Sequence, residues 1–169
     1  GLKGIELIIS DDHSGLRAAL RSVLPSVPWQ RCIFHLAQNA QAYVPNKAMR
    51  QEIAQVMRDI YQSRNRQEAM ERIKETALKY EKSAPRFSIW LEENAPEGLN
   101  FYSRPREHWK KIRTVNVVER LNGEVKRRTS VIRLFPNEAS CSRLVTAVVL
   151  EIHEEWVSGK KYLTMEEGR

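Results

Sequence analysis

The sequence predicts an α/β fold that is mostly helical, and three observations lead to this prediction. A short β-branched run at residues 5–9 ends in polar residues and is followed by a helical pattern. A second apolar run, at residues 27–34, has the length and composition of another strand. From residue 36 onward, apolar residues recur only at helical spacing. We therefore expect a strand, a helix, a second strand and then helices alone.

The first strand leads into two acidic residues, Asp11 and Asp12, which precede the first helix. In α/β folds, binding and catalytic residues tend to lie at the carboxyl ends of strands. An alternative is that one of the two acids caps the helix, whose apolar stripe begins at Leu16 and which Pro25 ends. Because there are two acids, one of them could cap the helix while the other has a different role.

The second strand leads into Cys32 and His35, which have the spacing of half a zinc site. A structural zinc ion needs four ligands, and the sequence offers no second pair of this kind. We therefore expect this pair to act in packing or orientation at the strand end. The other cysteine, Cys141, is far away in the sequence, and two such cysteines favour free thiols over a disulfide.

Residues 36–111 are predicted to form an all-helical segment. Two amphipathic stripes and a third, shorter helix, closed by Pro96 and Gly98, fill this segment. The Met and aromatic positions of these helices are most simply explained as core. The residues that define the three helices are Met49, Ile53, Val56, Met57 and Ile60, then Met70, Ile73, Ala77 and Tyr80, and finally Pro85, Phe87, Trp90 and Leu91.

A helix is expected at residues 117–128, with an apolar stripe on one side and Glu119 among basic residues on another. Two interpretations of Glu119 stay open. Asn116 could be the N-cap, with Glu119 reaching back to the backbone much as in a capping box. Alternatively, Glu119 could hold a divalent cation beside a phosphate while the basic residues follow a nucleic-acid backbone. A last amphipathic helix follows, with Asn137 as its expected N-cap.

The positive charge of the chain is concentrated in one segment. The 169 residues carry a net charge of +7, and residues 104–133 hold ten basic and three acidic residues, an excess of seven. A basic segment of this kind favours a polyanionic partner. No apolar run approaches the ~20 residues that a membrane span needs, and no signal peptide is recognisable. We expect a cytoplasmic protein without membrane segments.

Three stretches follow one another in a fixed order: residues 10–16 (SDDHSGL), residues 29–35 (WQRCIFH) and residues 114–122 (TVNVVERLN). Two more, KRRT at residues 126–129 and FPN at residues 135–137, come after them. With this combination the chain resembles the catalytic domain of Mutator-type transposases, the DDE enzymes of bacterial insertion sequences and their eukaryotic relatives. Together the matching stretches cover essentially the whole chain in the family's order.

The resemblance implies a partial RNase H-like fold of two strands with an all-helical insertion. Residues 1–35 would form a partial RNase H-like segment, residues 36–111 the insertion, and residues 112–169 the C-terminal helices of the RNase H-like domain. In such families two aspartates and a glutamate bind two divalent cations, usually Mg²⁺, or Mn²⁺. By position, Asp11 is similar to the second aspartate and Glu119 to the glutamate. Asp12 stands where the family usually has a small residue, so no catalytic role is assigned to it.

The same resemblance assigns further residues. Cys32, His35, Asn116 and Asn122 match signature positions of the family, and the role of Cys32 and His35 stays open. DNA contacts are expected from basic residues on and beside the helix that carries the glutamate. These residues are Arg113, Arg120, Lys126, Arg127 and Arg128.

The function implied by the resemblance is metal-dependent cleavage and strand transfer of DNA at insertion-sequence ends. Two cations ~3.5–4 Å apart serve the attacking and the leaving oxygen of such a reaction, and hard cations prefer carboxylate ligands. The family's first aspartate belongs on a strand upstream of Ser10, whereas the chain's remaining aspartate, Asp59, falls within the insertion. We therefore expect the isolated chain to be incomplete and inefficient in cleavage and strand transfer.

The expected partners are DNA, as transposon ends and as target, and a second copy of the chain. A partial sheet exposes strand edges and half a core, which a homodimer would cover and a rearranged fold would avoid. Action on DNA in the cytoplasm implies association with the nucleoid. An alternative function is a non-catalytic basic module that binds nucleic acid or another protein through residues 104–133.

Overall fold

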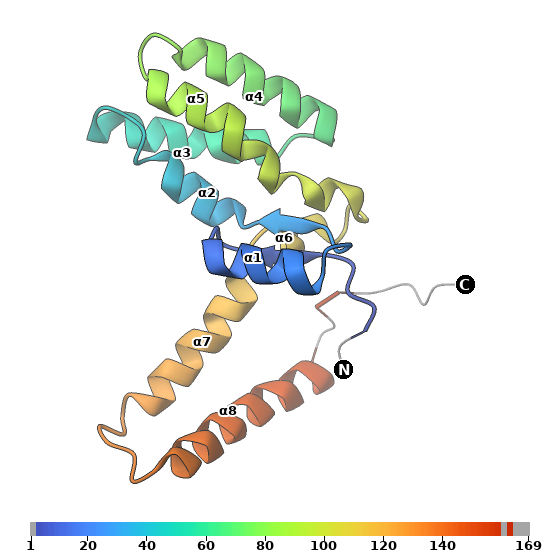
Figure 1. Cartoon of the computed structure of the whole chain (residues 1–169), viewed down its shortest axis with the longest axis vertical. Coiled ribbons are helices and arrows are strands. Elements are labelled where there is room, and N and C mark those ends of the chain that lie inside the picture. The colour runs from blue at the N-terminus through green and yellow to red at the C-terminus, as the bar shows by residue number, and fades with distance from the viewer. Residues whose placement is uncertain (1–2, 160–161, 164–169) are drawn as a thin grey trace. The chain divides into compact units, whose positions relative to one another are not determined.

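A computed structural model describes residues 3–159 and 162–163 of the chain (Figure 1). The chain divides into two compact units, residues 1–114 and residues 115–169. Residues 160–161 and 164–169, at the end of the predicted C-terminal segment, lie outside the described residues. Among the residues that are described, no helix combines the length and the apolar character that crossing a membrane requires.

The first unit opens with a strand, a helix and a second strand, as predicted. Strand β1 (Ile8–Ser10) pairs in parallel with β2 (Trp29–Arg31), and helix α1 (Ser14–Val23) connects them. Both strands are shorter than the predicted runs at residues 5–9 and 27–34. On one side the ladder stops at Pro28, which has no N–H to donate and only accepts from Ile8 N–H at 3.0 Å. On the other side the backbone turns into a helix at Ile33.

The N-cap of α1 is His13, whose Nδ1 accepts a hydrogen bond from the N–H of Leu16 at 3.4 Å. The alternative in which Asp11 or Asp12 caps this helix is therefore wrong. As predicted, α1 ends before Pro25, and its last turn is followed by a bond from Leu24 N–H to the Leu20 carbonyl at 2.8 Å.

The rest of the first unit is a helical body, which we define as residues 33–112. It contains α2 (Ile33–Ala40), α3 (Lys47–Tyr61), α4 (Arg66–Tyr80), α5 (Pro85–Asn94) and α6 (Trp109–Ile112), with the 3₁₀ helices η1 (Ala95–Gly98) and η2 (Asn100–Ser103) between α5 and α6. Asn46 and Asn65 cap α3 and α4 through side-chain bonds of 2.9 and 2.8 Å to the backbone N–H of Met49 and Glu68. Figure 1 shows α4 and α5 side by side with α3 and α2 beneath them.

The predicted apolar stripes form the core of this body. Phe87, Ile53 and Met57 are fully buried, and the ring of Phe87 meets that of Tyr80 edge to face, with centroids 5.5 Å apart. Gly98 allows two elements to approach closely, because a Cβ at this position would lie 2.8 Å from side-chain atoms of both Leu36 and Tyr61. The apolar pattern of residues 36–111 was therefore a reliable guide to the core.

The second unit is a helical hairpin of α7 (Asn116–Thr129) and α8 (Glu138–Ser158), which pack against each other. Asn137 caps α8, as predicted, by accepting from Ser140 N–H at 2.9 Å. The helix predicted at residues 117–128 is confirmed, but its expected N-cap is wrong: Val115 occupies the N-cap position and Asn116 is already helical, so the capping box is not formed. Val148 is the one buried apolar residue among the described residues of this unit.

Candidate functional site

Asp11 lies directly after β1, and its backbone is held in place from both sides. The Ser10 carbonyl accepts the N–H of Cys32 at 2.7 Å, and the Ser10 hydroxyl donates to the Asp11 carbonyl at 2.7 Å. The same hydroxyl accepts from the indole N–H of Trp29 at 2.9 Å. The Asp11 residue itself is exposed, and its carboxylate takes part in none of the hydrogen bonds or ion pairs found among the described residues.

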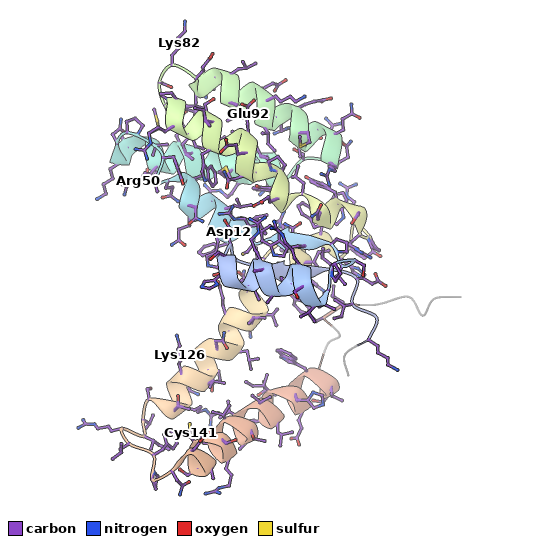
Figure 2. All side chains as sticks on the ribbon, viewed as in Figure 1. Asp12, Arg50, Lys82, Glu92, Lys126 and Cys141 are labelled. Atoms are coloured by element: carbon purple, nitrogen blue, oxygen red, sulfur yellow. The ribbon has the colours of Figure 1, made fainter. Side chains whose placement is uncertain are left out.

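Asp12, which Figure 2 labels, has the opposite environment. Its carboxylate lies between two arginines. Arg17 contacts one oxygen at 2.9 Å and Arg31 the other at 3.2 Å. Hydrogen bonding to Asp12 raises the pKa of Arg17, with Glu97 adding to the effect. The two neighbouring acids are thus distinct: Asp12 is engaged in structure, and Asp11 is available.

Arg31 and Arg17 also tie this strand end to the helical body. Arg31 is almost fully buried and contacts the Glu97 carboxylate of η1 at 3.1 Å and the Asn94 side-chain oxygen of α5 at 3.0 Å. Arg17 contacts the other Glu97 oxygen at 3.0 Å. We call Asp12, Arg17, Arg31 and Glu97 the anchoring network. It fixes the loop that carries Asp11 to a segment some eighty residues away in the sequence.

Gln30 makes a second connection from β2 to the helical body. The side chain is fully buried, and its amide nitrogen donates to the carbonyls of Gly98 and Arg31, each at 2.8 Å. Its oxygen accepts from the N–H of Phe101 at 2.9 Å. These bonds satisfy the buried amide of Gln30, and a buried polar group without a partner costs free energy of folding.

Sequence reasoning missed the roles of Gln30, Arg31 and Glu97. A usable signal was present, because a Gln-Arg pair in the middle of a short apolar strand requires buried polar partners. The sequence did not contain the identity of those partners, since they come from η1 and η2.

Cys32 is fully buried at the N-cap position of α2, where its carbonyl accepts the N–H of Leu36 at 3.0 Å. His35 is half-buried on the first turns of α2, and its ring meets that of Phe34 edge to face at 5.5 Å. Both cysteines are free thiols, as predicted. Within the described residues, no group of three or more His, Cys, Asp or Glu side chains has an arrangement that could hold a metal ion.

Glu119 lies on the exposed side of α7, in the first turn after Asn116. Asn116 and Asn122 are exposed on the same helix. Asp11 and Glu119 therefore belong to different units, the first to residues 1–114 and the second to residues 115–169. Each acid is presented on the surface of its own unit, and their proximity stays a prediction.

The basic residues predicted to contact DNA fall into three groups. Arg113 is half-buried in the first unit, where it donates to the Tyr61 carbonyl at 3.2 Å. Arg120 and Lys126 are exposed on α7 and form no ion pair among the described residues (Figure 2 labels Lys126). The third group, Arg127 and Arg128, is already paired with acids.

Glu124 holds both of these arginines. Arg127 Nε donates to it at 2.9 Å and Arg128 Nε at 2.8 Å, and Arg128 also contacts Glu151 of α8 at 3.2 Å. Hydrogen bonds from Arg127 and then Arg128 lower the pKa of Glu124 to about 2. A groove of about 490 Å³ lies between α7 and α8, and its lining includes Leu121 and Trp156 together with the charged Glu124, Arg128 and Glu151.

Comparison with known proteins places these features in a family context. Residues 1–159 match the family model described as transposase, Mutator family. The chain is 47% identical over 163 residues to the transposase for insertion sequence element IS406 of Burkholderia multivorans, covering 96% of the chain and 42% of that protein. It is 41% identical over 169 residues to the transposase for element ISRM5 of Rhizobium meliloti, covering 100% of the chain and 42% of that protein.

A third relative is the transposase for element IS1081 of Mycobacterium tuberculosis, which is 36% identical over 166 residues, covering 98% of the chain and 40% of that protein. The chain thus spans about two fifths of the length of the curated relatives it matches. The similarity includes the Asp11 loop, the helical body and the α7–α8 hairpin alike.

Proposed function

The chain belongs to the Mutator family of transposases, and from this premise we propose that it supplies two acids, Asp11 and Glu119, to a metal-dependent site that cleaves DNA and transfers strands at insertion-sequence ends. The observation that carries the proposal is the contrast between the two adjacent aspartates. The Asp12 carboxylate is paired with two arginines, whereas Asp11 is exposed on a backbone that its neighbours hold in place.

A fixed backbone with an unengaged carboxylate is what a metal ligand requires. A ligand must be held near its working position before the cation arrives, and it must not give up a strong ion pair to bind. Asp11 meets both conditions, since Ser10 and Trp29 fix its peptide and no cation among the described residues contacts its side chain. Glu119 contributes a second exposed carboxylate from α7.

The donor types fit a hard divalent cation such as Mg²⁺ or Mn²⁺, which prefers carboxylate oxygens. When bound, such cations activate the attacking oxygen and stabilise the leaving oxygen of a phosphodiester. Asp11 and Glu119 would hold them. The exposed cations Arg120 and Lys126, on the same helix as Glu119, would neutralise phosphates of the bound strand.

We also propose that the parallel β1–β2 pair, α1 and α7 belong to an RNase H-like arrangement in which the helical body is inserted. The order of the elements supports this, because a strand–helix–strand segment precedes the helices and the acidic helix follows them. The Arg31–Glu97 and Gln30–Gly98 contacts give the insertion a function in this arrangement, since they hold β2, the strand that pairs with β1 next to Asp11.

The proposal is tested by metal binding to the purified chain. Electron paramagnetic resonance of added Mn²⁺ gives the affinity of the wild type and of Asp11→Asn and Glu119→Gln. Loss of a supporting residue at a metal site costs on the order of 10–100-fold in affinity, and loss of a ligand should cost at least as much. Unchanged Mn²⁺ affinity in both variants would refute the assignment.

Matched controls are available in the same chain. Asp59→Asn removes an exposed aspartate of α3 whose carboxylate bonds only to Gln55 among the described residues, and Glu154→Gln removes an exposed glutamate of α8. Both controls should leave Mn²⁺ binding unchanged. Thermal unfolding of each variant separates a lost ligand from a lost fold, because substitution of exposed residues should move the midpoint little.

A second candidate function is a non-catalytic module that binds nucleic acid through the hairpin, and one observation favours it: Arg120 and Lys126 are exposed and unpaired among the described residues. The two functions differ in their dependence on metal. Binding of a DNA duplex that falls steeply with salt but is identical in Mg²⁺ and in a chelator would favour the module. Binding that Mg²⁺ strengthens in the wild type, and not in Asp11→Asn, would favour the catalytic site.

Self-association and association with nucleoid DNA are parts of the same proposal. The described part of α8 exposes large apolar side chains, among them Leu150, Trp156 and Val157. A homodimer that covers them predicts a mass of two chains by sedimentation equilibrium at micromolar concentration. A single-chain mass would contradict the homodimer and leave the assignment of Asp11 and Glu119 intact.

A further inference from the structure

The loop that joins α7 to α8, residues 130–137, exposes a cluster of aliphatic side chains that the proposed function does not use. We call this loop the hairpin tip. Val131 is 80% exposed, Leu134 86% and Ile132 41%. Single exposed apolar residues are normal on protein surfaces, but three within four positions of one loop require an explanation.

Basic residues flank these side chains in the sequence. Residues 126–143 hold five basic residues and one acidic residue, Glu138. Arg127 and Arg128 are occupied by Glu124. Lys126, Arg133 and Arg143 are exposed and form no ion pair among the described residues, so they are the cations available to a partner.

The hairpin tip is held at both ends. At the end of α7, the Thr129 hydroxyl donates to the Val125 carbonyl at 2.8 Å and the Ser130 hydroxyl donates to the Arg127 carbonyl at 3.1 Å. At the start of α8, Asn137 accepts from Ser140 N–H at 2.9 Å. These bonds fix the points at which the loop leaves α7 and enters α8.

We infer that the hairpin tip is a wedge for double-stranded DNA, in which Leu134 and Val131 enter between adjacent base pairs while Lys126, Arg133 and Arg143 contact the flanking phosphates. The combination favours DNA as the partner. Exposed aliphatic residues flanked by cations match a partner that has both an anionic backbone and apolar base faces. Proteins that bend DNA insert Leu, Ile or Phe between base steps in this manner, and unstacking a step costs a few kcal/mol. The phosphate contacts offset that cost.

This inference rests on the proposed action on DNA and adds to it a site and a mode of contact. It also shifts the main phosphate contacts of the second unit. The sequence predicts Arg127 and Arg128 as contacts, whereas their pairing with Glu124 leaves Lys126 and Arg133 better placed to act. Opening a base step would make strands at the end of an element accessible for cleavage.

The test uses the full chain and a set of short duplexes that carry 2-aminopurine, a base whose fluorescence rises when it is unstacked, at successive positions. Affinity is measured in parallel by anisotropy of an end-labelled duplex. The wild type should bind and increase the fluorescence at one or more positions. The double variant Val131→Ala/Leu134→Ala should still bind the duplex and lose the fluorescence increase.

Arg133→Ala should weaken binding and lower the slope of log affinity against log salt by about 1, as for one lost phosphate contact. Leu78→Ala is the matched control, because Leu78 is 71% exposed on α4 of the other unit and should change neither readout. Since all four substituted side chains are exposed, unfolding midpoints should stay close to that of the wild type.

The outcomes separate the wedge from the proposed function. Salt-dependent binding with no fluorescence change at any position, or with a change that the double variant keeps, overturns the wedge and leaves action on DNA standing. Absence of duplex binding overturns both. Binding that an acidic polypeptide displaces as well as unlabelled duplex does would assign the tip to a protein partner and likewise overturn the wedge.

Discussion

The helical body and the hairpin solve the problem of stability in different ways. In the body, apolar side chains such as Phe87, Ile53 and Leu91 are fully buried, and capped helices surround them. In the described hairpin, Val148 alone is buried, and α7 buries none of its residues. One ion pair, Arg128–Glu151, joins the two hairpin helices, and Glu124 pairs with Arg127 and Arg128 within α7.

The difference teaches where function is placed in this chain. Burial stabilises by roughly 25 cal/mol per Å² of apolar surface, whereas exposed ion pairs contribute about 0–1 kcal/mol each. The body is therefore the rigid part, and it holds the Asp11 loop through the anchoring network. Glu119 and the available cations are on the hairpin, which buries few apolar residues. Its exposed apolar residues are accessible to DNA or to another protein.

The largest expected effect is on the free energy of unfolding. One core side chain is truncated in the body and one in the hairpin. Phe87→Ala should lower the free energy of unfolding by about 3–5 kcal/mol, because it empties a fully buried site that also contacts Tyr80. Val148→Ala removes two methyl groups and should cost about 1–2 kcal/mol. Urea unfolding followed by circular dichroism measures both. Equal losses would mean that the hairpin is as well cored as the body.

A second prediction concerns the contact between the body and β2. Gln30→Ala leaves the buried Phe101 N–H and the Gly98 carbonyl without their partner, which should cost about 2–6 kcal/mol at roughly 1–3 per group. The matched control is Gln38→Ala, an exposed glutamine on α2. Urea unfolding again gives the result. A loss no larger than that of the control would show that the hydrogen bonds of Gln30 do not hold β2 to the helical body.

Substitution in the anchoring network should lower the free energy of unfolding by less than Gln30→Ala does. Glu97→Gln keeps the shape of the side chain and removes its charge, so that buried Arg31 retains Asp12 alone as a counter-ion. Because Glu97 and Asp12 are about a quarter to a third exposed, we expect about 1–2 kcal/mol, less than for a fully buried pair. Glu93→Gln, exposed on α5, is the control.

Hydrogen exchange gives the local readout for the same variant. Amides of residues 10–13 should exchange faster in Glu97→Gln than in the wild type, since the loop loses its connection to η1. Unchanged exchange in this loop, together with lower overall stability, would mean that Glu97 stabilises the body without positioning Asp11.

The sequence predicted the elements better than it predicted the contacts between them. Helical periodicity located the core residues of α3, α4 and α5 because each stripe is a local pattern. Strand ends were wrong because they depend on non-local pairing: β2 stops where Ile33 N–H bonds to the Arg113 carbonyl at 3.0 Å. The N-cap of α7 was displaced by one residue, within the usual uncertainty of helix ends.

The candidate site was predictable to a similar extent. Asp11 and Glu119 follow from matching stretches, but the sequence could not separate Asp11 from Asp12 by environment. That distinction comes from Arg31 and Glu97, which lie 66 positions apart in the chain and meet only in the fold. The occupation of Arg127 and Arg128 by Glu124 was, by contrast, readable as helical spacing of three and four residues.

The smallest effect, and the one most specific to the hairpin, is the titration of Glu124. Because Arg127 and Arg128 hold its pKa at about 2, below the ordinary value of 4.5, its ion pairs are present above pH 4.5 and are lost as the pH falls toward 2. The side chain should thus stay ionised at pH 3.5 in a ¹³C carboxyl titration by NMR. A midpoint near 4.5 would contradict the pairing.

Replacement of the same residue connects this titration to DNA. Glu124→Gln releases Arg127 at neutral pH, whereas Arg128 keeps its pair with Glu151, so duplex affinity should rise and the salt slope should steepen by about 1. Glu138→Gln is the control, because it removes an equal charge close to the hairpin tip. Among the described residues Glu138 pairs with no arginine, so this substitution releases none. If both variants raise affinity equally, net charge alone sets binding, and the ion pairs of the hairpin do not restrain its cations. A larger rise for Glu124→Gln would show that the ion pairs of Glu124 limit the affinity of the hairpin for DNA.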